Sequence, residues 1–258
     1  MDDIVVENRD SVCWIRLNRP ERMNAYDFEM AQALAKAIED NAQSGVIVIT
    51  GTGNAFCAGG FLGSLQEADE NELRTMFYNS LKLFDAIRRS PRPVIAAVNG
   101  PAAGGGNELV VACDLAIAAE SATFGQTGVR VGSAPVLGGT NFLAMNIGEK
   151  RAKEVAFLCR KYSAAQALDL GWINAVVPDD ELELEVGRWA DELLEMSPRY
   201  LEIAKISSNA WWNLSQESYS SGLGMLVQAI GSEDMQEGAR AFFEKRKPRF
   251  RQSPQKEE

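Results

Sequence analysis

The chain has 258 residues, of which 46% are hydrophobic and 24% are charged. This composition is typical of a folded domain with a large core, and it excludes a wholly disordered or collagen-like chain. Acidic residues outnumber basic residues by 36 to 26, giving a net charge of −10. Nucleic-acid-binding proteins usually have a basic excess, so we expect no nucleic-acid partner.

The sequence contains no histidine. This absence excludes Ser-His-Asp and Cys-His catalysis, together with H-E-x-x-H zinc chemistry. Any general acid or base must then be Glu, Asp, Lys, Tyr, Cys or a bound water. We expect no metal site.

The four cysteines are widely spaced, and no two form a C-x-x-C pair. A disulfide framework would be unusual in a chain of this size, so we expect reduced thiols in a cytoplasmic protein. The chain begins with Met-Asp-Asp, which lacks the basic start of a signal peptide. No apolar run approaches the ~18 residues that a membrane span requires.

The first half of the chain alternates between strand and helix patterns. We expect strands at 4–6, 12–17, 46–50, 94–98 and 115–118, and helices at 28–42, about 73–90 and 107–112. Asp27 is a candidate N-cap of the first helix. Buried strands followed by helices predict an α/β fold with crossover connections. After about Gly139 the pattern is mainly helical, with candidates at 141–147, 150–159, 164–170, 181–196, 198–211 and 233–245.

Two glycine-rich loops follow predicted buried strands. Residues 56–61 read Phe-Cys-Ala-Gly-Gly-Phe, and residues 104–108 read Gly-Gly-Gly-Asn-Glu. Open α/β sheets bind ligands at the carboxyl ends of their strands. One backbone N–H from each loop could converge on a single oxygen and form an oxyanion hole. Either loop could also be a tight turn without a ligand, and neither has the spacing of a known phosphate-binding loop.

Glu108 lies on the first turn of the short helix after Gly106, beside Leu109 and Val110. Burying a carboxylate among apolar residues is costly unless it has a partner or a role. Partial burial would raise its pKa into a range useful for acid–base catalysis. Its charge could instead simply stabilise the helix N-terminus. Residue chemistry alone leaves both interpretations open.

Several short motifs recur together in a recognisable order along the chain. They are Pro-Val-Ile-Ala-Ala-Val-Asn-Gly at 93–100, Gly-Gly-Gly-Asn-Glu-Leu at 104–109, Cys-Asp at 113–114, Phe-Cys-Ala-Gly-Gly at 56–60 and Phe-Gly-Gln at 124–126. This set resembles the signature of the crotonase (enoyl-CoA hydratase/isomerase) superfamily over nearly the whole chain. The resemblance implies a crotonase-like spiral of ββα units with a helical C-terminal region. It also implies a core at 1–195 and, at 196–258, a helical region for oligomerisation and active-site cover, in homotrimers or hexamers.

The resemblance also assigns roles to individual residues. The substrate would be an acyl-CoA thioester, with coenzyme A present as part of the substrate rather than as a separate cofactor. The catalytic positions would be Glu108 and the backbone N–H groups of Gly60 and Gly105, which would bind the thioester oxygen. The substrate-binding positions would be Ala25 and Ala58 for the adenine half, Phe61 and Leu62 in the acyl pocket, Gln126, Gly128 and Pro135 near the reacting atoms, and Lys247 for the phosphates.

The chain departs from the hydratase pattern at one important position. Hydratases of the superfamily use two glutamates, and the second falls here on Gly128. The segments 124–128, 131–133 and 157–162 instead resemble 1,4-dihydroxy-2-naphthoyl-CoA synthase and 2-ketocyclohexanecarboxyl-CoA hydrolase. In some such synthases a bound bicarbonate replaces the missing glutamate, which would place a small anion near Gln126. However, the Trp and Asp of that subgroup fall on Ala156 and Pro135.

Three hypotheses about function therefore stay open. The first is hydratase- or isomerase-type chemistry, most simply a lyase, through an oxyanion-stabilised enolate. The second is formation, cleavage or decarboxylation of a C–C bond in a β-keto acyl-CoA. The third is a catalytically inactive CoA-binding protein, which the missing acids at Gly128 and Pro135 favour and the retained Glu108 disfavours.

Overall fold

The computed structural model describes residues 2–60, 63, 70–214 and 216–250. Within these residues the main sheet has six strands in the order β1-β2-β3-β4-β6-β9. They are β1 (Ile4–Arg9), β2 (Val12–Leu17), β3 (Val46–Gly51), β4 (Val94–Val98), β6 (Leu115–Ala119) and β9 (Ala175–Val177). The first two form an antiparallel hairpin, and the other neighbours are parallel. The predicted hairpin and buried parallel strands are confirmed.

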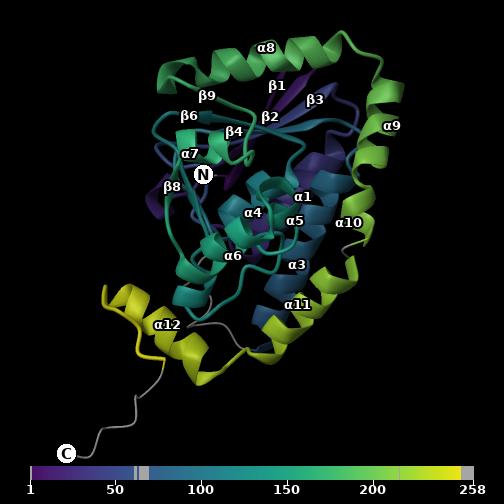
Figure 1. Cartoon of the computed structure of the whole chain (residues 1–258). Helices are drawn as coiled ribbons and strands as arrows, with labels where there is room; N and C mark the ends of the chain where they lie inside the picture. The colour runs from purple at the N-terminus through teal and green to yellow at the C-terminus, as the bar shows by residue number, and fades with distance from the viewer. Residues whose placement is uncertain (1, 61–62, 64–69, 215, 251–258) are drawn as a thin grey trace, which may run out of the picture.

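Apolar clusters cover both faces of this sheet. Alternate residues of a strand point to opposite faces, so each central strand contributes to both clusters. Val46 and Val48 of β3 pack in one apolar cluster with α8 (Leu182–Leu194). Ile47 and Ile49 face the other cluster, which includes α1 (Phe28–Asp40) and α3 (Glu70–Arg89). Figure 1 shows α8 lying over one side of the sheet, away from α1 and α3. Asp27 accepts a hydrogen bond from the Met30 N–H, which confirms it as the N-cap of α1.

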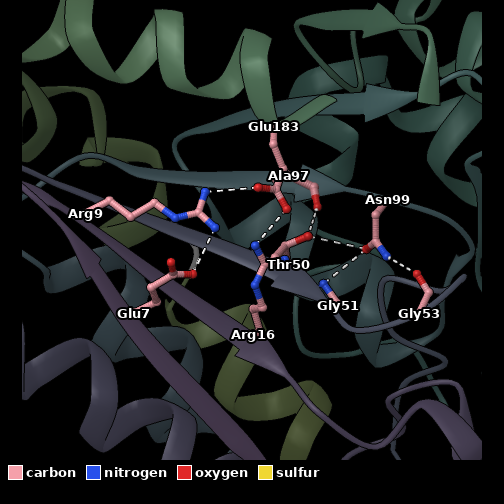
Figure 2. A network of polar contacts seen from close by, with 9 residues as sticks. All are labelled: Glu7, Arg9, Arg16, Thr50, Gly51, Gly53, Ala97, Asn99 and Glu183. Carbon is pink, nitrogen blue, oxygen red and sulfur yellow. Dashed lines mark hydrogen bonds and ion pairs between the residues drawn. The ribbon is translucent and has the colours of Figure 1, made fainter. Parts of the chain in front are cut away.

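Glu183, at the start of α8, ties this helix to the hairpin. Its carboxylate accepts hydrogen bonds from Arg9 at 3.0 Å and from Arg16 at 2.7 Å, while Arg9 also donates to Glu7 (Figure 2). The side chains of Glu183 and Glu7 are about half exposed, so solvent screens these ion pairs. The apolar cluster beneath α8 therefore supplies most of its attachment.

A second, smaller sheet lies beside the carboxyl ends of the main strands. It consists of β5 (Ala102–Ala103), β7 (Thr123–Gly125) and β8 (Tyr162–Ser163). Parallel bridges from Cys57 to Ala102 and from Tyr26 to Gly60 continue the same pattern of pairing. The small sheet thus brings together the two glycine-rich loops that the sequence places far apart.

The remaining elements are mostly helical. They are α4 (Gly105–Ala112), α5 (Phe142–Ile147), α6 (Glu149–Leu158), α7 (Ala164–Asp169), α9 (Pro198–Ser208), α10 (Ala210–Leu214), α11 (Gln216–Gln228) and α12 (Glu233–Phe243), with short 3-10 turns at Pro20–Arg22, Gly128–Arg130 and Asp179–Glu181. Figure 1 shows α9, α10 and α11 descending along one side of the molecule, with α11 beside α3. None of the described helices is long and apolar enough to cross a membrane.

Buried polar contacts fasten α9 to the core. Lys205 is 8% exposed, and its ammonium group lies 2.7 Å from Asp114. It also donates to the carbonyl oxygens of Ile87 and Arg92 at 3.0 and 2.8 Å. Asp114 in turn accepts a hydrogen bond from the Val94 N–H at 2.8 Å, so one ion pair joins α9 to the start of β4.

A second polar contact is made by Asn209, four residues after Lys205. Arg88 at the end of α3 donates to the Asn209 side chain at 3.1 Å, and Asn209 donates back to the Arg88 carbonyl at 3.0 Å. The Arg88 guanidinium lies 5.0 Å from the centre of the Trp212 ring, which stacks on Phe142 at 3.9 Å. The helix predicted at 198–211 is therefore two helices, with Asn209 between them.

The structure adds elements that the sequence did not predict. The strands β5, β7, β8 and β9 have only two or three residues each, which is too short for an alternating pattern to be visible. Helix α11 contains Gly222 and Gly224, and glycine disfavours isolated helices. This helix forms because Leu223 and Leu226 pack into the main core.

Candidate active site

Polar contacts at the carboxyl ends of β3 and β4 fix the loop that leads to the first glycine-rich segment. The Thr50 hydroxyl donates to the Ala97 carbonyl at 2.8 Å. Asn99 accepts from the Gly51 N–H at 3.1 Å and donates to the Gly53 carbonyl at 2.9 Å (Figure 2). The chain therefore leaves the sheet along a defined path toward Phe56.

The two glycine-rich loops are in direct backbone contact. The Ala103 N–H donates to the Cys57 carbonyl at 3.0 Å. Gly59 has a φ of +94°, and a Cβ atom there would lie only 2.8 Å from the Gly105 nitrogen. A Cβ atom on Gly106 would overlap the Cys57 carbonyl. Only glycine permits this approach, which is the physical reason for the two Gly-rich sequences.

Gly60 and Gly105 present their N–H groups from these facing loops. Gly105 is the first residue of α4, where backbone N–H groups have no partner within the helix. Within the described part of the chain, no protein acceptor binds either N–H. The Tyr26 hydroxyl occupies the space that a side chain at 105 would take. Both N–H groups are therefore free to donate to a ligand oxygen.

Glu108 lies one turn into α4 and is 4% exposed. Its Oε1 accepts hydrogen bonds from the N–H groups of Leu137 and Gly139, both at 2.9 Å. Burial raises the pKa of Glu108 to about 8, although the two N–H donors stabilise the carboxylate and act in the opposite direction. The carboxyl group is therefore able to take up and release a proton near neutral pH.

Gln126 packs against the same loop as Glu108. Its side chain is 1% exposed, and neither its oxygen nor its nitrogen has a hydrogen-bond partner among the described residues. A Cβ atom on Gly139 would overlap the Gln126 amide and would lie 2.9 Å from Pro135. The structure therefore brings Gln126, Pro135 and Glu108 to one place. Buried polar groups are rarely left unbonded, so a water or small ligand beside Gln126 is expected.

Gly128 lies in the 3-10 turn that follows Gln126. A Cβ atom on Gly128 would lie 3.2 Å from the backbone of Ala134, which is tighter than most side-chain contacts. A side chain at position 128 would therefore press on the Ala134 backbone.

The other predicted substrate-binding residues are placed unevenly. Ala25 is buried, and the Ala58 N–H donates to the Met23 carbonyl at 2.9 Å, so these residues belong to adjoining loops. Phe61 and Leu62 lie outside the described residues. Lys247 is exposed in the segment after α12, and the contacts of the described residues do not join it to the glycine-rich loops. The described residues contain no group of His, Cys, Asp and Glu side chains suited to a metal ion.

Sequence reasoning missed several groups that form the site. The N–H groups of Leu137 and Gly139 hold Glu108, but a backbone donor leaves no signal in residue type. Asn24, Tyr26 and the Cys57 thiol also line the loops. The signal available for Asn24 was its position directly before Ala25, which the resemblance assigned to the adenine half of the substrate.

This arrangement defines a class of protein: an α/β fold in which two glycine-rich loops meet and the second loop opens a helix that carries a buried carboxyl group. Comparisons with known proteins agree. A family model described as enoyl-CoA hydratase/isomerase matches residues 7–254. The chain therefore belongs to the enoyl-CoA hydratase/isomerase family, the crotonase superfamily of acyl-CoA enzymes, and has the mixed α/β crotonase fold.

Solved structures of similar sequence cover almost the whole chain. An enoyl-CoA hydratase from Mycobacterium avium subsp. paratuberculosis K-10 is 29% identical with a TM-score of 0.86, covering 97% of this chain and 99% of its own. An enoyl-CoA hydratase subunit from Geobacillus kaustophilus HTA426 is 36% identical with a TM-score of 0.76, covering 97% and 98%. A carnitinyl-CoA hydratase from Mycobacterium avium is 30% identical with a TM-score of 0.84, covering 95% and 97%.

Proposed function

We propose that the chain catalyses hydratase- or isomerase-type chemistry on an enoyl-CoA. The enolate oxygen would be bound by the N–H groups of Gly60 and Gly105. The observation that carries this proposal is the position of Glu108, a buried carboxyl one turn from Gly105 on the same helix. One rigid element then holds both an oxyanion donor and an acid/base group. Preorganised N–H donors at a developing oxyanion are usually the largest contribution to such catalysis.

Glu108 is the acid/base group of this mechanism. Because Oε1 is held by two backbone N–H groups, we assign the proton transfer to Oε2. In isomerisation the carboxylate removes a proton from C2 and returns it to C4, which moves the double bond. In hydration it accepts a proton from water as hydroxide adds to C3, and the proton is delivered to C2. The raised pKa suits both tasks near neutral pH.

Gln126 is assigned the binding of a water or a small anion beside Glu108. Its buried amide lacks a protein partner among the described residues and packs against the loop that holds Glu108. That molecule would stand where hydratases of the family carry a second glutamate, since Gly128 offers no carboxylate. Pro135 lines the same space.

The coenzyme A part of the substrate is assigned to the loops around Ala25 and Ala58, which adjoin the oxyanion loop. Lys247 is the proposed contact for the phosphates. Phe61 and Leu62 are the proposed acyl-pocket residues, and they follow Gly60 directly in the sequence.

The test follows the ultraviolet absorbance of the conjugated thioester with purified protein. We expect 2-enoyl-CoAs to lose this absorbance on hydration, or 3-enoyl-CoAs to gain it on isomerisation. Glu108→Gln should lower the rate by roughly 10²- to 10⁴-fold while CoA binding persists. Glutamine keeps the oxygen that accepts both N–H groups, so the loop geometry is preserved. Glu120→Gln, at an exposed position, is the control and should leave the rate unchanged. Activity that survives Glu108→Gln would refute this mechanism.

The second candidate is C–C bond chemistry on a β-keto acyl-CoA, of the naphthoyl-CoA synthase or ring-hydrolase type. The observation that favours it is the tight, side-chain-free position at Gly128 next to the unbonded amide of Gln126. Cyclic β-keto and carboxylated acyl-CoAs test this candidate if enoyl-CoAs give no reaction. Binding of CoA without turnover of any of these substrates would instead support an inactive CoA-binding protein.

We also propose that the chain assembles as a homotrimer or hexamer through the C-terminal region. Large apolar side chains are exposed on α9, α10 and α11, including Tyr200, Ile206, Trp211, Leu214 and Met225. An apolar surface of this kind is typical of an interface. The four free, buried thiols favour a reducing compartment such as the cytoplasm.

A further inference from the structure

Asn24 is fully buried in the loop between β2 and α1, and its side chain binds three backbone groups in two loops. Its Oδ1 accepts the Arg19 N–H at 3.0 Å. Its Nδ2 donates to the carbonyl oxygens of Thr52 at 3.0 Å and Ala55 at 2.8 Å. Asn24 itself has a φ of +56°, a left-handed conformation that asparagine tolerates better than most residues. This side chain therefore holds the loop after β3 against the loop before α1.

Cys57 extends the network into the oxyanion loop. Its thiol donates to the Asn24 carbonyl at 3.2 Å, and its sulfur accepts the Gly59 N–H at 3.3 Å. Burial raises the pKa of Cys57 to about 12, so the thiol keeps the proton that it donates. Gly59 has the left-handed φ that turns the chain, and Gly60 follows it.

We propose that Asn24 and Cys57 are positioning residues that fix the backbone at Gly59 and thereby aim the Gly60 N–H at the substrate oxygen. This inference rests on the proposed function, because it deepens the role of the same oxyanion hole. Cys57 acts on both sides of the hole, since its carbonyl also accepts the Ala103 N–H just before α4. The hydrogen bonds of both side chains go to backbone groups, so the role proposed for them is indirect.

The chain offers a matched control for the thiol. Cys13 on β2 is a second fully buried cysteine in the same apolar cluster. Its sulfur makes no hydrogen bond to any described residue, and burial raises its pKa as well. Cys13→Ala therefore removes the same atoms from the same core without touching the oxyanion loop.

The experiment measures the infrared carbonyl stretch of butyryl-CoA labelled with carbon-13 at the thioester carbon. Binding to the wild-type protein should shift this stretch to lower frequency, because two N–H donors polarise the carbonyl. Cys57→Ala should lose roughly half of the shift or more, and Cys57→Ser should restore most of it, since a hydroxyl can also donate and accept. Cys13→Ala should keep the full shift. Turnover should follow the same order, with kcat of Cys57→Ala about tenfold lower and KM nearly unchanged.

The outcomes separate this inference from the proposed function. A full shift in Cys57→Ala, equal to that of wild type and Cys13→Ala, would overturn the positioning role while leaving the oxyanion hole intact. No shift in the wild-type complex would overturn the oxyanion hole and the positioning role with it. Asn24→Asp replaces the Nδ2 group, which donates to Thr52 and Ala55, with a carboxylate oxygen. If this variant folds, its infrared shift should be smaller than that of Cys57→Ala. If Asn24→Asp does not fold, the Cys57 series still tests whether this network aims the Gly60 N–H.

Discussion

The glycine-rich loops and the C-terminal helices are built by opposite means. In the loops, backbone groups meet so closely that glycine is required, and buried polar side chains such as Asn24 and Glu108 bind backbone groups of neighbouring segments. The C-terminal helices are fastened by polar contacts at Lys205 and Asn209 and by core side chains such as Leu223, and they leave other large apolar side chains exposed. The difference teaches that close backbone contacts fix the geometry of the first region, whereas the second region keeps an exposed apolar surface, which the proposed assembly would cover.

Removing the ion pair that fastens α9 should have the largest effect. Lys205→Met leaves the Asp114 carboxylate without its cation in a mostly buried place, so the free energy of unfolding in urea should fall by about 3–5 kcal/mol. Lys150→Met, at an exposed position on α6, should change it by less than ~0.5 kcal/mol. Equal values for the two variants would show that the contact does not fasten the helices. A separate early transition in Lys205→Met would support the proposed division between 1–195 and 196–258.

A side chain at Gly105 should damage the oxyanion hole without removing its donor. In Gly105→Ala the new methyl group overlaps the Tyr26 hydroxyl, so the buried Tyr26 ring must shift against the start of α4 and kcat should fall about 10- to 100-fold. Adding Tyr26→Phe removes the overlapping oxygen and should recover part of the loss. Gly187→Ala on α8, where a Cβ atom meets nothing, is the control and should leave kcat unchanged. A fully active Gly105→Ala enzyme would show that the loops are less closely fixed than the contacts indicate.

The raised pKa of Glu108 should govern the pH profile. If Glu108 acts as a base, kcat/KM should rise about tenfold per pH unit below pH 8 and level off above it. The Glu108→Gln variant should lack this limb. A flat profile between pH 6 and 8 in the wild type would contradict the assignment of Glu108 as the base.

The same group should also make the stability of the fold depend on pH. The folded-state pKa of about 8 lies above the ordinary value of 4.5, so ionisation favours the unfolded chain between these values. Wild-type stability should therefore fall, relative to Glu108→Gln, as pH rises from about 4.5 to 8, and the difference should stay constant above that range. Urea unfolding at several pH values measures it.

The exposed apolar surface should govern assembly rather than folding. Leu214 is 75% exposed, so Leu214→Glu should leave the melting temperature nearly unchanged while lowering the mass measured by light scattering. Leu184 on α8 is similarly exposed, at 68%, but lies outside the C-terminal helices, and Leu184→Glu should keep the wild-type mass. A reduced mass for Leu184→Glu alone would move the proposed interface to the α8 face.

The sequence by itself determined the order of the long elements and the family. Buried strands such as Val46–Gly51 carry continuous apolar runs, and Asp27 marks the start of α1, because both signals are local. The motifs around Gly60, Gly105 and Glu108 pointed to the candidate site for the same reason.

Only the tertiary structure decided how these pieces meet. The donors that hold Glu108 are backbone N–H groups of Leu137 and Gly139, and the sulfur of Cys57 reaches the carbonyl of Asn24 across 33 positions of sequence. Such contacts depend on the path of the chain and leave no periodic pattern. Helix α11 and the two- and three-residue strands exist because neighbouring elements pack against them or pair with them, which residue propensity does not reveal.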